Sequence, residues 1–258
     1  MIPTATESAL ALSELGRALV NLLFPPLCVV CRQGLCEDEE EICRTCRNRF
    51  TELPLPACRR CAAPLPPQPD PYHPEPCRHC PPAPVHFDAA GAALLYDGAA
   101  ADALCAYKFR FRRRLARVFV PPMIDAVERL WTEVSFTAVV PVPLHRARQR
   151  WREFNQSELL AQGLCEARHL SLVADAVVRV KRTPPQSRYG SHARRRSNIA
   201  GAFRVENARP LEGGCILIVD DIMTSGATVN ELARVLKEAG AGKVFVLTAA
   251  RAVGHRPA

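Results

Sequence analysis

Residues 216–228, with the sequence ILIVDDIMTSGAT, constrain the fold of this chain more than any other stretch. Four β-favouring apolar residues predict a short buried strand at 216–219, and Asp220 and Asp221 follow it. Small residues then lead into a predicted helix at 229–239; they let a backbone close around an anion, and the helix N-terminus directs N–H groups at it. Asp side chains beside such a loop hold sugar hydroxyls or the Mg²⁺ that accompanies phosphates. The run therefore predicts a phosphorylated-sugar site, with loop residues Thr224, Ser225, Gly226, Ala227 and Thr228.

The run has two other interpretations. An ordinary strand–turn–helix, in which the acid pair only caps the turn, is the simplest alternative. A P-loop nucleotide hydrolase is excluded, because the sequence contains no G-x-x-x-x-G-K-[ST].

Apolar runs continue the pattern over the C-terminal two-thirds of the chain. Alternating strands and helices predict an α/β fold, a parallel sheet with helices on both faces. Ligands of such sheets bind at the carboxyl ends of the strands, where Asp220 and Asp221 lie. The predicted strands are 90–96, 137–140, 177–180, 216–219 and 244–249.

Local signals predict where the helices begin and end. The N-x-x-E spacing of Asn155 and Glu158 predicts a helix that ends near residue 169. Thr228 and Glu231 have the spacing of a capping box for the helix after the acid pair. The Pro-Pro pair at 121–122 predicts a break in an earlier helical stretch, with a second helix beginning there.

Eight of the twelve cysteines form four C-x-x-C pairs, which predict zinc binding in the N-terminal third. Two thiolates separated by two residues fit one face of a tetrahedral zinc ion, and a second pair completes it. Pairing in chain order gives two four-cysteine sites, whereas a cross-braced arrangement of alternate pairs fits the sequence equally well. Four cysteine ligands leave no open position for a substrate, so the zinc is expected to be structural. The predicted ligands are Cys28, Cys31, Cys43, Cys46, Cys58, Cys61, Cys77 and Cys80.

Twelve of the 23 prolines lie between residues 54 and 84, where they exclude helices and central strands. We expect loops held by metal in this segment, since little core is available there. The chain is thus expected to contain an amphipathic N-terminal helix at 1–24, a double zinc module at 25–86 and the α/β domain at 87–258.

Charge and terminal composition bear on ligands and compartment. The net charge of +8 arises mostly from arginines at 110–117, 146–152 and 179–196, which suit a diphosphate, a nucleotide or a nucleic-acid backbone. A solvated basic surface is the alternative.

The N-terminus lacks a basic n-region and carries interrupting charges, so it is predicted to be neither a signal peptide nor a membrane span, and the protein to be cytoplasmic. The polar, basic stretch at 183–201 is predicted to be a lid over the site.

The run at 216–228 resembles the 5-phosphoribosyl 1-diphosphate (PRPP) motif of type I phosphoribosyltransferases. Together with the preceding cysteine pairs, it makes the chain similar to the ComF family over nearly its whole length. Glu153 and Phe111 depart from this pattern, because the family usually has Gly at the first position and often at the second. The family-like segments are LLFPPLCVVC at 22–31, YKFR at 107–110, VVPVPLH at 139–145, FNQSELLA at 154–161, RVKRTPPQSR at 179–188, RRRSNIAGAF at 194–203 and LTAAR at 247–251.

The resemblance implies binding of PRPP or a nucleotide with Mg²⁺, and a role in DNA uptake during natural transformation at the inner face of the membrane. Asp220 and Asp221 would hold the ribose hydroxyls and organise Mg²⁺ during phosphoribosyl transfer to an unnamed acceptor. A non-catalytic adaptor that binds PRPP and single-stranded DNA beside a competence helicase is one alternative, and a zinc-stabilised scaffold is another. The candidate countercharges for diphosphate are Lys108, Arg152 and Arg195.

Overall fold

The computed structural model describes residues 25–66, 77, 79–80, 83–110, 112–181 and 199–253. The expected helix at 1–24, most of the expected lid at 183–201 and the candidate residue Arg195 lie outside these described residues. Within the described part, no helix is both long enough and apolar enough to cross a bilayer.

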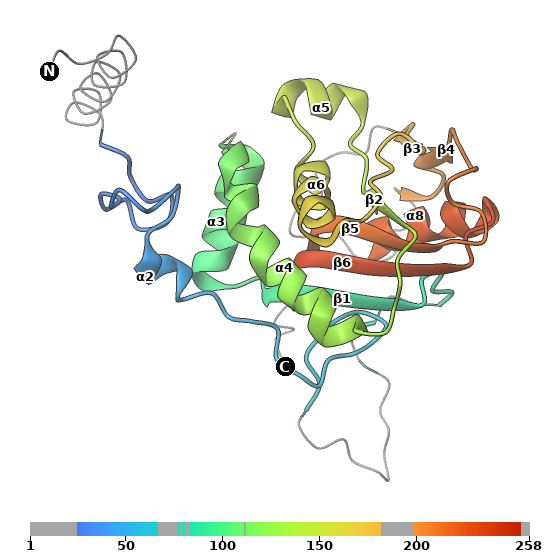
Figure 1. Ribbon diagram of the computed structural model, residues 1–258, viewed down its shortest axis with the longest axis horizontal. Helices are drawn as coiled ribbons and strands as arrows, with labels where there is room; N and C mark the ends of the chain where they lie inside the picture. Colours follow the sequence, from blue (N-terminus) through green and yellow to red (C-terminus); the bar gives the residue numbers. More distant parts are fainter. Residues whose placement is uncertain are drawn as a thin grey trace, which may run out of the picture.

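A four-stranded parallel sheet forms the centre of the fold (Figure 1). Its strand order is β1-β6-β5-β2, so the strand that carries the acid pair is an inner strand. The strands are apolar on both faces because helices cover both, which confirms the predicted α/β fold. The strand bounds are β1 (Ala89–Leu95), β2 (Ala138–Pro141), β5 (Cys215–Met223) and β6 (Lys243–Arg251).

Helices α3 (Gly98–Phe109), α4 (Ala116–Trp131) and α6 (Gln156–Arg168) build the core on one face of the sheet. On the other face lie α8 (Ala227–Glu238) and an antiparallel pair of strands, β3 (Val177–Arg179) and β4 (Phe203–Val205). The remaining elements are short: α2 (Arg44–Arg47), the 3-10 helix η1 (Arg113–Leu115) and α5 (Arg146–Arg152).

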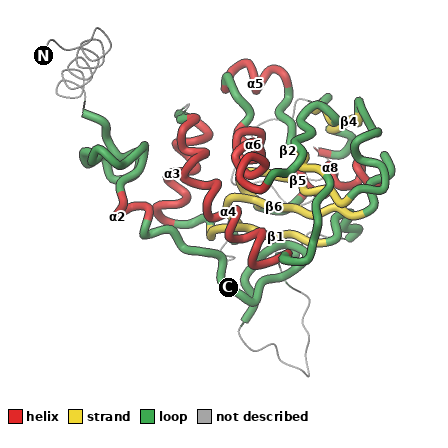
Figure 2. The backbone as a smooth tube through the Cα atoms, in the orientation of Figure 1, coloured by secondary structure: helices red, strands yellow, loops and turns green. Residues whose placement is uncertain are grey.

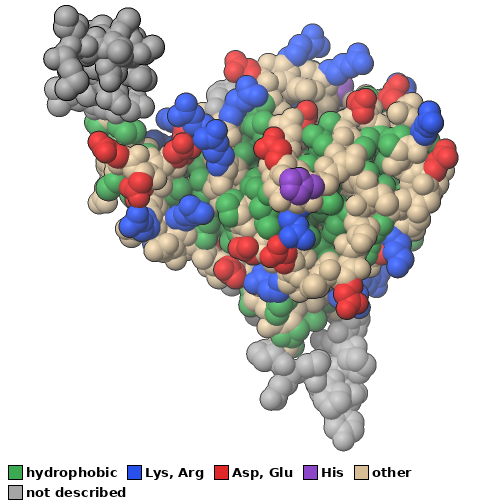
Figure 3. Space-filling model, viewed as in Figure 1, with side chains coloured by type: hydrophobic (Ala, Val, Ile, Leu, Met, Phe, Trp, Pro, Cys, Tyr) green, Lys and Arg blue, Asp and Glu red, His purple; other side chains and the backbone are tan. Residues whose placement is uncertain are grey.

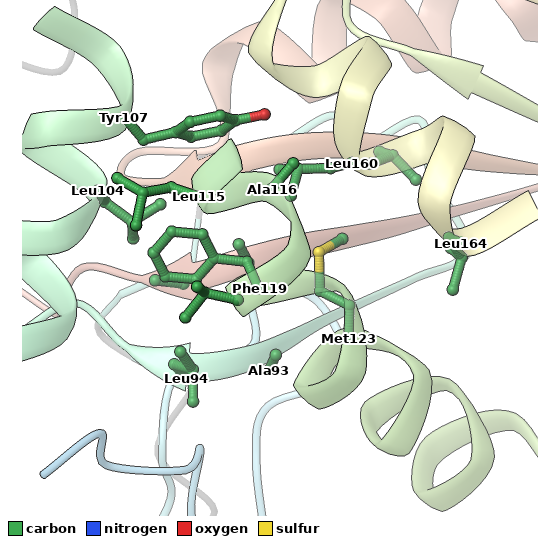
Figure 4. Packing of buried hydrophobic residues seen from close by; sticks show 14 of the residues in the cluster. Ala93, Leu94, Leu104, Tyr107, Leu115, Ala116, Phe119, Met123, Leu160 and Leu164 are labelled. Carbon is green, nitrogen blue, oxygen red and sulfur yellow. The ribbon is translucent and has the colours of Figure 1, made fainter. Parts of the chain in front are cut away.

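Phe119 lies at the centre of the first core, fully buried among side chains from β1, α3 and η1 (Figure 4). Its ring stacks on Phe50 of the cysteine-rich segment, with ring centroids 5.8 Å apart. Tyr107 lies beside it, and its hydroxyl points toward α6, where it donates a hydrogen bond to the Gln156 carbonyl at 2.8 Å. This contact fixes α3 against α6, and therefore Lys108 against the end of β5.

The predicted helix break at Pro121 and Pro122 is wrong, because α4 runs through both prolines. Pro121 is exposed and Pro122 is half-buried, so neither ring is fully buried in the core. A proline inside a helix costs about 3 kcal/mol. The two prolines together therefore cost about 6 kcal/mol. Burial of Phe119, Met123 and Val127 on the same helix contributes about 1.5–3 kcal/mol each, which offsets this cost.

The predicted capping box at Thr228 and Glu231 is also wrong, because α8 begins at Ala227 with Gly226 as its N-cap. Gly226 has φ +74°, a left-handed conformation that glycine adopts without a steric penalty. Glu231 instead accepts the Gly201 N–H at 2.6 Å and pairs with Arg234 at 2.7 Å. Thr228 therefore lies inside the first turn of the helix.

The cysteine-rich segment is nearly all loop, apart from α2 (Figure 2), and packs on both faces of the sheet. Cys28, Cys43 and Cys46 belong to the core of α3 and α4, whereas Cys58 and Cys61 belong to the core of α8. Between them, residues 51–53 hydrogen-bond to the free edge of β1, with the Leu95 N–H donating to the Thr51 carbonyl at 2.8 Å. The boundary expected at residue 86 stays a prediction, and the segments on its two sides share buried cores.

Candidate functional site

The acid pair lies inside the C-terminal half of β5, because the strand expected to end at residue 219 continues to Met223. This part of the strand is close to the edge of the sheet where α/β proteins bind ligands. Asp220 is partly buried, and its Oδ1 accepts the Ser157 hydroxyl at 2.8 Å and the Asp221 N–H at 2.9 Å. Burial, followed by the neighbouring charge of Asp221, raises the pKa of Asp220 to about 7. At neutral pH a bound cation would therefore complete the ionisation of this carboxyl group.

Lys108, at the last turn of α3, forms an ion pair with Asp221. Its Nζ lies 3.0 Å from Asp221 Oδ1, and both side chains are mostly buried. The sequence analysis names Lys108 as a candidate countercharge for diphosphate, and the structure places its side chain beside the acid pair. Its ammonium group thus lies within the same site as the carboxylates.

The turn after β5 forms a shallow, open hollow. Its floor is the left-handed Gly226 and the first turn of α8, whose N–H groups lack partners within the helix. The Ser225 hydroxyl oxygen accepts one of them, the Ala227 N–H, at 3.5 Å. The structure thus brings together the predicted acid at 220 and all five predicted loop residues; the lining residues are Asp220, Ile222, Met223, Thr224, Ser225, Gly226, Ala227, Thr228 and Val229.

Arg152, the last residue of α5, is only 8% exposed and donates from Nη1 to Gln156 Oε1 at 3.0 Å. Among the described residues, neither its Nε nor Gln156 Nε2 has a hydrogen-bond partner. Burial lowers the pKa of Arg152, and the charge of Asp221 acts in the opposite direction. Two buried donors without acceptors are costly to leave unsatisfied, and both belong to residues outside the lining of the hollow.

Ser157 and Gln156 were not identified as site residues from the sequence, although they lie in the FNQSELLA segment. The only local signal there, the helix cap at Asn155, is confirmed: its Oδ1 accepts the Ser157 N–H at 3.2 Å. Asn155 also donates to the Val142 carbonyl at 3.1 Å, which ties the start of α6 to the end of β2. This anchoring directs Ser157 at Asp220.

The eight paired cysteines form two clusters, and within each cluster the sulfur atoms lie within 4.8 Å of one another. Sulfur–sulfur distances are 3.7 Å for Cys31 and Cys43, and 3.5 Å for Cys58 and Cys80. Zn–S bonds of about 2.3 Å in a tetrahedron place sulfur atoms about 3.8 Å apart, whereas a disulfide needs about 2.05 Å. Both clusters therefore fit structural zinc, and the chain-order arrangement replaces the cross-braced one: Cys28, Cys31, Cys43 and Cys46 in the first cluster, Cys58, Cys61, Cys77 and Cys80 in the second.

Comparisons with known proteins match two parts of the chain to two family models. A family model described as a double zinc ribbon domain matches residues 19–81, and one described as a phosphoribosyl transferase domain matches residues 118–256. DNA utilization protein YhgH of Escherichia coli (strain K12) is 31% identical over 229 residues, which cover 87% of this chain and 96% of the relative.

Two further relatives carry competence in their names. Competence protein F of Haemophilus influenzae is 28% identical, over 87% of this chain and 96% of the relative. Competence protein ComFC of Bacillus subtilis is 26% identical, over 80% of this chain and 82% of the relative. With its two cysteine clusters packed against a parallel α/β sheet, this chain belongs to the ComF family of proteins, in which a double zinc ribbon is joined to a phosphoribosyl transferase domain.

Proposed function

We propose that this protein binds PRPP with Mg²⁺ at the hollow after β5 and transfers its phosphoribosyl group to an acceptor during the handling of incoming DNA. The observation that carries the proposal is the convergence of three features on one site. An acid pair, a loop of helix N–H groups and a buried arginine with an unsatisfied donor all lie at the carboxyl edge of the sheet. The link to DNA uptake is supported by the names of the relatives.

Each residue has a role set by its chemistry. The N–H groups and hydroxyls of 224–228 would hold the 5-phosphate, because a helix N-terminus favours anions. Asp220 and Asp221 would hold the ribose hydroxyls and provide the oxygen ligands that Mg²⁺ prefers. When bound, Mg²⁺ would neutralise charge on the departing diphosphate.

Basic residues would stabilise the diphosphate as it leaves the sugar. Arg152 is held in place by Gln156, and its buried Nε has no hydrogen-bond partner among the described residues. Lys108 would turn from Asp221 toward the diphosphate once that carboxylate has other partners. Arg195, which lies outside the described residues, is kept as a third candidate.

The test is calorimetric titration of PRPP and Mg²⁺ into zinc-loaded protein, with Asp220→Asn/Asp221→Asn as the comparison. We expect saturable binding in the wild type and its loss in the double variant. Exposed Asp125→Asn on α4 is the matched control, and it should bind as the wild type does. Absence of binding in the wild type would refute the proposal; binding would justify screening acceptors for diphosphate release.

A second candidate function, a non-catalytic adaptor for single-stranded DNA, is favoured by the surface near α5. Figure 3 shows Lys and Arg side chains gathered over α5 and near the end of α3. Trp151 of α5 and Phe109 at the end of α3 are 58% and 55% exposed, and bases stack on such rings. Binding of oligonucleotides that weakens steeply with salt, and that Arg112→Ala and Arg114→Ala reduce, would support this function.

The scaffold alternative predicts that transformation survives without the acid pair. The double Asp220/Asp221 variant, introduced into a naturally competent relative's background, separates the cases. Normal transformation frequency with that variant would favour a scaffold that presents a surface to a helicase. We expect instead a loss of transformation, together with the loss of PRPP binding.

A further inference from the structure

Arg251, at the end of β6, is a buried cation that the proposed chemistry does not use. It is 2% exposed and is the largest fully buried side chain among the described residues. Its Nη1 donates to the Met223 carbonyl at 2.9 Å and to the Thr224 carbonyl at 2.5 Å. Met223 ends β5, and Thr224 is the first residue of the loop 224–228 that is proposed to hold the phosphate, the phosphate loop. Arg251 therefore supports the backbone from which that loop starts.

The same guanidinium group reaches the second zinc ribbon. Its Nη2 donates to the His79 carbonyl at 3.4 Å, and His79 lies between the ligands Cys77 and Cys80. The first zinc ribbon has no such contact with the phosphate loop among the described residues.

Charge balance explains why an arginine occupies this position. No ion pair joins Arg251 to a carboxylate in the described part of the chain. A buried charge without a counterion is costly. Zinc with four thiolate ligands has a formal charge of about −2, and it would supply the counterion that Arg251 otherwise lacks.

A second connection runs from the ribbon to helix α8. The Asn230 side chain accepts the His86 N–H at 2.8 Å and donates to the Pro84 carbonyl at 3.0 Å. The chain that leaves the second cluster is thereby fixed to the second turn of the helix whose N-terminus forms the phosphate site. Both ends of the phosphate loop, Thr224 and α8, are thus tied to the same ribbon.

We infer that Arg251 is a positioning residue through which the second zinc ribbon holds the phosphate loop in its binding shape. Zinc at Cys58, Cys61, Cys77 and Cys80 should therefore strengthen binding of the phosphorylated ligand, whereas zinc in the first cluster should not. This inference rests on the proposed function for its ligand. Because coupling is reciprocal, bound ligand should also slow the loss of zinc from the second cluster only.

The first experiment compares Cys77→Ser with Cys31→Ser, each of which removes one ligand from one ribbon. Amide hydrogen exchange is measured for residues 222–230 in the ligand-free proteins, with β1 as the reference for global unfolding. For Cys77→Ser, but not for Cys31→Ser, we expect amide exchange in 222–230 to be at least about ten times faster than in the wild type. We also expect PRPP and Mg²⁺ to bind to Cys77→Ser about ten times more weakly than to the wild type. Equal exchange and equal affinity in the two variants would overturn the inference.

The second experiment uses Arg251→Lys, which keeps the charge but loses the guanidinium fork that reaches both segments. We expect faster exchange at 222–230 with both zinc ions retained by metal analysis. Wild-type protein supplies a measurement that needs no variant, the rate of zinc transfer to a chromogenic chelator with and without PRPP and Mg²⁺. If PRPP and Mg²⁺ slow the transfer of only one of the two bound zinc ions, the coupling is supported. If they slow the transfer of both ions or of neither, the coupling is refuted.

These readouts separate the inference from the function on which it rests. If the wild type binds no PRPP, the proposed function fails, and the exchange comparison between Cys77→Ser and Cys31→Ser still decides whether the ribbon supports the loop. If PRPP binds and the two cysteine variants match, the function stands and the coupling fails.

Discussion

Replacing Asp220 by asparagine should stabilise the ligand-free, zinc-loaded protein at alkaline pH. Asparagine retains an oxygen that accepts the Ser157 hydroxyl and the Asp221 N–H, but it carries no charge to bury beside Asp221. The variant therefore removes an electrostatic cost while it keeps the local hydrogen bonds. It should also weaken Mg²⁺-dependent binding, so that stability and function change in opposite directions.

The magnitude follows from the pKa of Asp220, which burial and then the charge of Asp221 raise from 3.8 to about 7. The folded state holds this proton more tightly than the unfolded state, so the contribution to stability is complete below about pH 4 and is lost as pH rises through 7. The full shift corresponds to about 4 kcal/mol. Because Asp220 is partly exposed to solvent, we expect about 1–2 kcal/mol after screening.

Urea denaturation of both proteins between pH 4 and pH 9 measures this difference. The free energy of unfolding of Asp220→Asn should exceed that of the wild type at pH 8, and the gain should shrink toward zero near pH 4. Asp175→Asn, at an exposed position, is the matched control and should show no such pH-dependent gain. A variant that is less stable than the wild type at pH 8, or a difference independent of pH, would refute the electrostatic reasoning.

Three further predictions concern the site and the core. Ser157→Ala removes the hydroxyl donor to Asp220 Oδ1; the loss of a hydrogen bond to a charged group should weaken calorimetric binding of PRPP and Mg²⁺ by about 1.5–3 kcal/mol, and unchanged affinity would exclude Ser157 from the site. Gly226→Ala places a side chain at φ +74°, so the thermal unfolding midpoint should fall by an amount that corresponds to about 1 kcal/mol; an unchanged midpoint would contradict this backbone argument. Phe119→Ala empties the fully buried centre of the first core and should cost about 3–5 kcal/mol in urea denaturation, whereas a loss below about 1 kcal/mol would show that the core collapses around it.

The position of the candidate site was predictable from sequence because it depends on residues that are close in the chain. The strand, acid pair and small-residue loop at 216–228 are consecutive, and the structure gathers them around one hollow. The C-x-x-C spacing likewise indicated eight zinc ligands. It did not decide how the pairs combine, because that depends on the path of the chain between them, and only the sulfur positions resolve it.

Errors arose where tertiary contacts outweigh a correct local signal. Pro121 and Pro122 do disfavour a helix, but burial of the opposite face holds α4 together through them. Thr228 and Glu231 do have capping-box spacing, but Gly226 starts the helix earlier and Glu231 is used by Gly201 and Arg234. In both cases the deciding contacts come from residues that the local pattern does not include.

Arg251 shows why part of the site's support could not be predicted at all. Besides the adjacent Ala252 carbonyl, its acceptors are the backbone carbonyls of Met223, Thr224 and His79, which lie 28, 27 and 172 residues away in the chain. A carbonyl is present at every residue, so no side-chain pattern marks the position that a distant arginine will use. Only the β5–β6 register, which places Met223 opposite Arg251, brings the phosphate loop and the second ribbon to one guanidinium group. The cysteine pairs of the zinc ribbon and the residues of the phosphate loop can each be recognised in the sequence. The hydrogen bonds of Arg251 that connect them form only when the sheet has formed.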